Sequence, residues 1–359
     1  MSIVESIGHE LAARKNLALV SIVKQLASAP RHAGASMLVG EEGLLAGTIG
    51  GSILEKQAIE AGMRVAKSGV AEFMDFQLSG TDAASNGMIC GGSMRVFVEP
   101  LRPDGPTTVL FQRLAIAQGV GDDMFSVVPV VAPGARRLCR KKAKNWPLPT
   151  ELSALVREEL EKNDLAAPLE LEDSRGQRFV IEPWPGPWRL LCLGGGHVAL
   201  ATARLAASTG FTVCVLDDRE EFASKERFPM AAVTRAVPEY EDCLAGIATE
   251  EKTFIVIMTR GHVYDRKVLS QALRTQASYI GMIGSNKKIA TTFAGLKEEG
   301  FTDEDLSRVT APVGLSIGAE TPEEIAVSIM AQLIATRSLL QGTDRHLNAD
   351  LAGRVHKFG

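Results

Sequence analysis

The chain has 359 residues, which is too long for one ordinary domain and enough for two. Its 45% hydrophobic and 23% charged residues exclude a disordered chain, and its net charge of -4 argues against a nucleic-acid-binding protein. The apolar runs are too short to span a membrane, and the N-terminus shows no secretory signal, so we expect no membrane partner. Five cysteines without a Cys-x-x-Cys pair argue against a disulfide framework or zinc knuckle and favour a reducing cytoplasm.

Residues 1–132 are expected to form a small α+β domain. Its predicted helices cover Ser2–Arg14 and Ser52–Lys67, and its predicted strands cover Leu17–Val23, Ser36–Val39, Leu44–Ile49, Glu72–Leu78 and Met94–Glu99. A further helix and strand complete the domain. Between the last two of the named strands lies Gly80–Ser93, a glycine-rich stretch of 14 residues. Loops of this length are uncommon in compact domains and are often functional.

Residues 133–187 are interpreted as a connector with one helix, Leu152–Lys162, and one strand, Arg178–Glu182. Arg136–Lys144 holds six basic residues in nine. This run is either a solvated loop or a patch for an anionic ligand or acidic partner. The proline-rich segment Pro183–Pro187 then breaks the chain before the next domain.

Residues 188–359 alternate short apolar strands with helical segments, which is typical of a doubly wound parallel sheet. The predicted strands are Leu190–Leu193, Thr212–Leu216, Ala232–Ala236, Phe254–Met258 and Tyr279–Ile283. The final helix should start at Pro322, with Thr321 and Glu324 forming a capping box, and should end near Leu340.

A glycine turn follows the first of these strands. Gly194, Gly195, Gly196 and His197 belong to a Gly-x-Gly-x-x-Ala pattern between a strand and a helix. Such glycines permit a tight turn and close approach of a pyrophosphate, which the free N–H groups of the helix N-terminus bind. The pattern therefore predicts a Rossmann-like domain with a nucleotide-type ligand at this turn. A vacant or repurposed turn is the alternative, and His197 either faces a ligand or merely opens the helix.

The second strand ends at Asp217, 23 residues after Gly194. A carboxylate at this spacing commonly binds a ribose 2′-hydroxyl in dinucleotide-binding domains. We therefore expect Asp217→Ala to weaken ligands with a free ribose hydroxyl; otherwise Asp217 caps the next turn.

Two further strand–turn–helix junctions should lie at the same sheet edge, where open α/β sheets bind ligands. One carries Thr259 and His262. The other carries Ser285, a predicted helix cap, and Lys287, whose place in the first helical turn favours a bound anion. The lysine is otherwise an exposed surface residue.

Several motifs, taken in order, resemble the xanthine dehydrogenase accessory factor family, XdhC/CoxI. The resemblance covers nearly the whole chain and rests on Ser28–Arg31, Gly47–Gly51, Gly87–Gly92, Gly194–Ala199, Thr259–Asp265, Tyr279–Ser285 and Gly314–Ser328. One departure is Ser316, which stands where the family usually has Asp.

The resemblance implies a maturation factor rather than an enzyme. Such a factor binds molybdenum cofactor (molybdopterin, or its dinucleotide form), shields it for sulfuration by a cysteine desulfurase and delivers it to a molybdenum hydroxylase apoenzyme. The resemblance also implies a two-domain homodimer. Cys90 and Gly91 lie in the glycine-rich loop, where a thiolate suits molybdenum and glycines permit close approach. Cys90 is therefore the candidate molybdenum contact, with a structural thiol as the alternative.

Two other functions remain open at this stage. An NAD(P)-dependent oxidoreductase would use the same glycine turn, although the Tyr-x-x-x-Lys proton relay is absent from the sequence. A scaffold whose nucleotide site regulates assembly is the other. Bound pterin measured against NAD(P)H turnover separates the first two.

Overall fold

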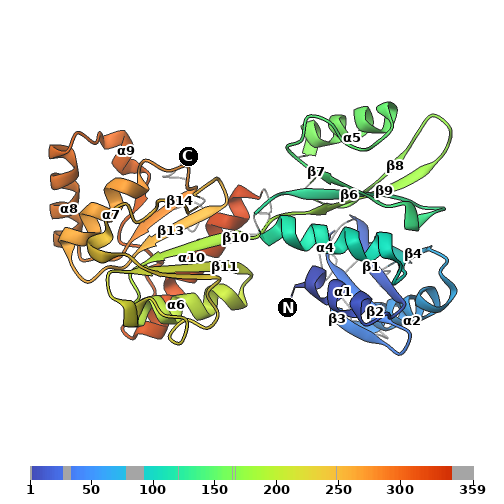
Figure 1. Ribbon diagram of the computed structural model, residues 1–359, viewed down its shortest axis with the longest axis horizontal. Coiled ribbons are helices and arrows are strands. Elements are labelled where there is room, and N and C mark those ends of the chain that lie inside the picture. The colour runs from blue at the N-terminus through green and yellow to red at the C-terminus, as the bar shows by residue number, and fades with distance from the viewer. Residues whose placement is uncertain are drawn as a thin grey trace. The chain divides into compact units, whose positions relative to one another are not determined.

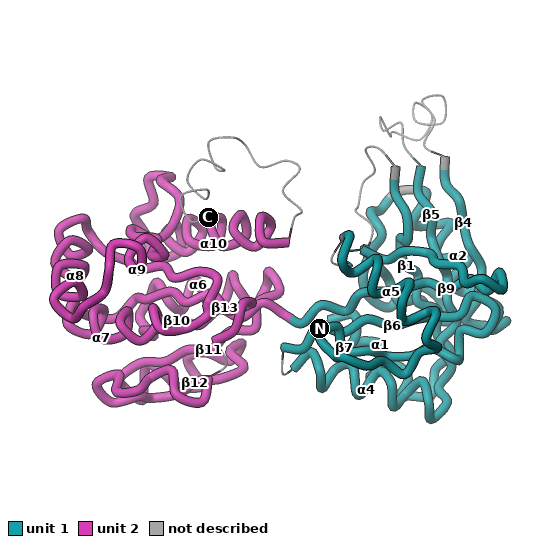
Figure 2. Tube along the Cα trace, turned by 90° about the horizontal axis from the view of Figure 1, so that it is seen from above, with its two compact units in different colours: residues 1–186 teal, residues 187–359 magenta. Residues whose placement is uncertain are grey.

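The computed structural model describes residues 2–26, 34–77, 93–119, 121–163, 165, 167–247 and 249–341. The chain divides into two compact units, residues 1–186 and 187–359 (Figure 2). Each unit has its own sheets and its own hydrophobic cores. The boundary falls inside the proline-rich break Pro183–Pro187.

Unit 1 contains two antiparallel sheets (Figure 1). The five-stranded sheet has the order β3-β2-β1-β5-β4, whose strands are Leu44–Gly47, Ser36–Gly40, Leu17–Leu26, Ser93–Leu101 and Glu72–Gln77. The four-stranded sheet has the order β7-β6-β9-β8, whose strands are Arg137–Arg140, Met124–Pro129, Arg178–Trp184 and Leu169–Glu172. The helices are α1 (Ile3–Ala12), α2 (Ser52–Ser68), α4 (Gly105–Gly119) and α5 (Thr150–Asn163).

These helices cover the sheets through their apolar faces. Ala58 and Val65 of helix α2 belong to one hydrophobic cluster with Val20 and Val96 of the five-stranded sheet. Helices α1 and α4 join a second cluster with the alternate residues of β1, while α5 covers the four-stranded sheet. Because side chains alternate along a strand, β1 is apolar on both faces and lies at the centre of the unit.

A buried polar cluster lies between strands of the two sheets. The guanidinium of Arg136 binds Glu99 of β5 through Nη2 and Nε, binds Glu182 of β9 at 3.0 Å and donates to Ser126 Oγ at 2.9 Å. Ser21 of β1 completes the cluster by donating to Glu182 at 2.6 Å. One buried cation therefore serves two buried carboxylates, which favours retention of a proton.

Glu99 should make the stability of unit 1 depend on pH. Burial and the charge of Glu182 together raise its pKa to about 7, against the opposing attraction of Arg136. Since the folded-state pKa exceeds the unfolded value, the folded chain binds more protons between these pH values. The free energy of unfolding should fall by about 1 kcal/mol per pH unit from pH 5 to 7.

Urea unfolding across this pH range measures the slope, and Glu99→Gln should flatten it. An equal slope in the wild type and the variant would assign the titration to another group.

Unit 2 is built on one parallel six-stranded sheet with the order β12-β11-β10-β13-β14-β15. Its strands are Val233–Ala236, Phe211–Asp217, Trp188–Leu193, Thr253–Ile257, Tyr279–Met282 and Val309–Thr310. The helices are α6 (His197–Ser208), α7 (His262–Ala272), α8 (Asn286–Glu298), α9 (Asp303–Ser307) and α10 (Pro322–Leu340). Strand order reverses direction at β10, as in the Rossmann fold. The predicted α/β class with a C-terminal Rossmann-like sheet is confirmed.

Helices cover both faces of this sheet (Figure 1). Leu190 and Cys192 of β10 face the core shared with α6 and α10, and Leu191 and Leu193 face the core shared with α7, α8 and α9. Strands buried on both faces explain the continuous apolar runs in the sequence. Helix α10 begins with the expected capping box, in which Thr321 Oγ1 accepts the N–H of Glu324.

Two features differ from the sequence expectations. Residues 133–187 are expected to be a connector, yet they supply β7, α5, β8 and β9 to unit 1. The basic run begins in the buried cluster at Arg136 and continues as β7, which pairs with β6.

Across the described residues, no helix is long and apolar enough to cross a membrane.

Candidate functional site at the carboxyl edge of the parallel sheet

The glycine turn lies where the strand order of unit 2 reverses. Strand β10 has β11 on one side and β13 on the other, so the turn after β10 lies between the ends of both neighbours. Helix α6 starts at His197, directly after this turn. The crevice outside the carboxyl ends at such a point is where open α/β sheets bind ligands.

The three glycines of the turn differ in the space that surrounds them. Gly194 has a φ of +115°, and a Cβ there would lie 2.3 Å from the carbonyl oxygen of Met258. A Cβ at Gly195 would lie 1.9 Å from the carbonyl oxygen of Phe222. In contrast, a Cβ at Gly196 would meet nothing within 4 Å. The first two glycines are therefore needed by the fold, while the third leaves open space at the N-terminus of α6.

Asp217 is buried at the end of β11 and binds protein groups with both carboxylate oxygens. It accepts from the N–H of Gly195 at 2.7 Å and from the N–H of Arg219 at 3.0 Å. The Arg219 guanidinium adds bonds of 2.9 and 3.2 Å. Burial acts to raise the pKa of Asp217, but these donors hold it below its usual value. Asp217 thus fixes the glycine turn, and its contact with a ribose stays a prediction.

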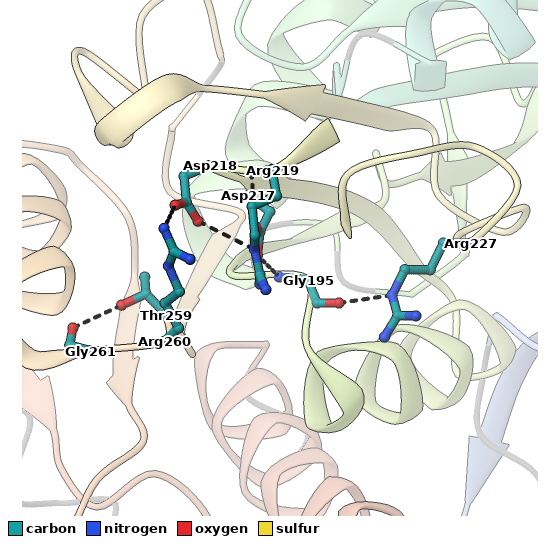
Figure 3. Close-up of polar contacts among 8 residues, drawn as sticks. All are labelled: Gly195, Asp217, Asp218, Arg219, Arg227, Thr259, Arg260 and Gly261. Atoms are coloured by element: carbon teal, nitrogen blue, oxygen red, sulfur yellow. Dashed lines mark hydrogen bonds and ion pairs between the residues drawn. The ribbon is translucent and has the colours of Figure 1, made fainter. Parts of the chain in front are cut away.

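Asp218 and Arg260 form an ion pair between the two strands that flank β10 (Figure 3). Arg260 Nη2, in the turn after β13, lies 2.6 Å from Asp218 Oδ2, just after β11. The Asp218 side chain is 5% exposed, and burial together with the neighbouring Asp217 raises its pKa despite Arg260. Arg227 Nε donates to the carbonyl of Gly195 at 3.0 Å, so three arginines surround this edge.

Thr259 is held in place by a buried carboxylate. Its hydroxyl bonds to Asp265 of α7 and to the carbonyl of Gly261 at 3.1 Å. Asp265 is fully buried and pairs with Lys288 in the first turn of α8. Thr259 therefore positions the backbone of its turn and leaves Arg260 as the side chain that projects from it.

The other predicted residues lie at helix N-termini of the same edge. His197 opens α6 and His262 opens α7, and both are exposed. Ser285 caps α8 by accepting the N–H of Lys288 at 3.4 Å, and Lys287 is exposed beside it. Their positions agree with a shared edge of the sheet, and their contacts with a ligand stay predictions.

Cys90 and Gly91 lie outside the described residues. The four described cysteines are buried. Burial raises the pKa of Cys139 and Cys192 to about 12 and that of Cys243 to about 11, which keeps these thiols protonated. Within the described part of the chain, no group of three or more His, Cys, Asp or Glu side chains could hold a metal ion.

Sequence reasoning assigned no site role to four charged residues of this edge, Asp218, Arg219, Arg227 and Asp265. A usable signal existed for some of them. Asp218 and Arg219 follow a predicted strand end, and Asp265 belongs to the Thr259–Asp265 motif. Arg227 had none, because its contact with Gly195 depends on the path of a loop.

Fold and site together define unit 2 as a Rossmann domain of the XdhC type, with the XdhC Rossmann domain model matching residues 190–333. A second model, described as the XdhC and CoxI family, matches residues 10–77. The chain belongs to the XdhC and CoxI family.

Curated relatives include a probable xanthine dehydrogenase subunit from Bacillus subtilis, 27% identical, with 89% of this chain and 92% of the relative covered. The molybdenum cofactor insertion chaperone PaoD from Escherichia coli is 24% identical, with coverages of 91% and 85%. The uncharacterized protein YqeB, also from Escherichia coli, is 24% identical over 90% of this chain, which spans only 44% of that relative's length.

A solved structure shares the fold over the chain. The crystal structure of a xanthine dehydrogenase from Bacillus halodurans superposes with a TM-score of 0.75, covering 96% of this chain and 97% of the other at 24% identity.

Proposed function

We propose that this chain binds molybdenum cofactor, protects it during sulfuration by a cysteine desulfurase and delivers it to a molybdenum hydroxylase such as xanthine dehydrogenase. The names of two relatives, a probable xanthine dehydrogenase subunit and a molybdenum cofactor insertion chaperone, support this role. The proposal includes a cytoplasmic homodimer. The observation that carries it is the open space at Gly196, before the N-terminus of α6.

The chemistry of the edge fits the anionic part of such a cargo. Molybdenum cofactor is a pterin with a phosphate, which the dinucleotide form extends to a pyrophosphate. The free N–H groups and dipole of a helix N-terminus favour phosphate, and arginine binds it through parallel hydrogen bonds. The open space at Gly196 and the half-exposed Arg260 supply both kinds of donor at one edge. Donors of this kind bind without a covalent bond, so the site suits a cargo that is first held and then released.

The decisive experiment measures cargo and delivery together. The chain is purified without oxygen from a host that makes molybdopterin, and bound pterin is measured per protomer. The loaded chain is then mixed with apo-hydroxylase and a cysteine desulfurase, and hydroxylase activity is followed. We expect pterin on the chain and activity above that reached with free cofactor. NAD(P)H turnover without pterin would favour an oxidoreductase and overturn the proposal.

Cys90 should contribute to cofactor handling. Its place among glycines in the sequence favours an accessible thiolate. We expect Cys90→Ser to lower bound cofactor, or the yield of active sulfurated hydroxylase, at least several-fold while the chain stays folded. Cys139→Ser offers a control thiol that is buried. Equal cofactor occupancy and equal hydroxylase activation by Cys90→Ser would make Cys90 a structural residue.

A further inference from the structure

We infer that the glycine-turn site selects its ligand by a phosphate or pyrophosphate rather than by a ribose diol, and that this anion competes with Asp218 for Arg260. The inference rests on the proposed function and names the chemical group by which that site recognises its cargo. It makes Arg260 the specificity-determining residue.

The first step concerns Asp217, the position that would bind a ribose. A carboxylate has about four lone-pair sites. Four donors already occupy Asp217: the N–H groups of Gly195 and Arg219, and Nε and Nη2 of the Arg219 side chain. Its exposed fraction is 1%. A ribose diol would have to displace Arg219 and remove a bond that supports the glycine turn, so Asp217 is filled by the protein itself.

The second step concerns the ion pair between Asp218 and Arg260. Strand β10 lies between β11 and β13, so the pair joins its two neighbours across the end that carries the glycine turn. The turn that bears Arg260 abuts the glycine turn, because the carbonyl of Met258 lies against Gly194. The turn that bears Arg260 therefore lies directly beside the turn that carries the glycines, and Figure 3 shows Arg260 reaching toward Asp218 at this edge.

The third step is that the guanidinium of Arg260 stays accessible while it pairs with Asp218. The Arg260 side chain is 52% exposed, so an incoming anion can reach it. Asp218 holds Arg260 through Oδ2, while its buried Oδ1 accepts no hydrogen bond among the described residues and lies 3.7 Å from Arg219 Nε. A phosphate at the N-terminus of α6 offers Arg260 a second anion, with bidentate geometry and the helix dipole added.

Binding of inorganic pyrophosphate by calorimetry tests the competition. We expect Arg260→Ala to weaken binding about tenfold, since a hydrogen bond to a charged group contributes about 1.5 kcal/mol. We expect Asp218→Asn to tighten binding by about fivefold, because Arg260 is released. The double variant should match Arg260→Ala. Arg266→Ala is the control: it removes an exposed arginine of α7 that pairs with Glu299, and it should leave the affinity for pyrophosphate unchanged.

Two nucleotides test whether a ribose diol contributes to binding. ADP and 2′,3′-dideoxy-ADP should bind the wild type with equal affinity. ADP binding at least tenfold tighter than its dideoxy form would overturn the inference, as would unchanged pyrophosphate binding in Arg260→Ala. If Asp218→Asn does not fold, the Arg260→Ala result and the nucleotide pair still decide.

Failure of the inference differs from failure of the proposed function. Arginine-dependent pyrophosphate binding by a chain that never carries pterin would keep the inference and remove the proposed cargo. Pterin delivery by a chain whose pyrophosphate binding is unchanged in both Arg260→Ala and Asp218→Asn would keep the proposed function and remove the inference.

Discussion

Replacing Gly196 with valine should weaken retention of molybdenum cofactor at least tenfold and leave the fold unchanged. Apart from its chain neighbours, a Cβ at this position meets no protein atom within 4 Å, so the added side chain starts in open space. The same space is where a phosphate would approach the N–H groups of α6. Bound pterin per protomer and the thermal unfolding midpoint, measured on one preparation, check both parts.

Gly195→Val is the matched comparison. Its Cβ would lie 1.9 Å from the carbonyl oxygen of Phe222, so this variant should lose stability as well as cofactor. Full cofactor retention by a folded Gly196→Val chain would place the ligand elsewhere.

Replacing Arg136 with leucine should lower the free energy of unfolding of unit 1 by about 3–5 kcal/mol, the usual result of removing one partner of a buried ion pair. The variant leaves Glu99 and Glu182 buried without their shared cation. Both carboxylates would then take up protons, which limits the loss at low pH. Urea unfolding followed by tryptophan fluorescence measures the change, since Trp184 donates to Ser126 of the same cluster.

Arg137→Leu is the control in the adjacent position. Arg137 is exposed and donates to the carbonyl of Ala135 at 2.8 Å, so its replacement should change the free energy of unfolding by about 0.5 kcal/mol or less. Adding Glu99→Gln and Glu182→Gln to Arg136→Leu should restore part of the lost stability. If Arg136→Leu lowers the free energy of unfolding by less than about 1 kcal/mol, water must reach the charges of this cluster.

Local signals in the sequence predicted much of unit 2. The capping box at Thr321–Glu324 defined the start of α10, and the glycine turn located the junction of β10 with α6. Short-range chemistry decides both features, since each depends on residues within a few positions. The apolar runs of β10, β11 and β13 likewise indicated strands buried on two faces.

Contacts between distant residues were not predictable in the same way. Arg136 pairs with Glu99 and Glu182, which are 37 and 46 residues away, so the sequence alone indicated only a solvated loop or a patch for an anion. Asp218 and Arg260 are 42 residues apart. The position of Asp217 followed from spacing, but its engagement by Arg219 depends on side-chain direction. Composition and periodicity carry no information on such pairings.

The close contact of Gly194 with Met258 has a thermodynamic consequence. The carbonyl of Met258 lies so near Gly194 that no methyl group fits between the two turns, and the N–H of Met258 bonds to the carbonyl of Leu193 at 2.7 Å. The two turns therefore lose their conformational entropy when the chain folds rather than when a ligand arrives. A ligand then meets a preorganised edge, so little of its binding free energy goes to ordering backbone. Release is equally simple, because departure of the ligand requires no segment to unfold.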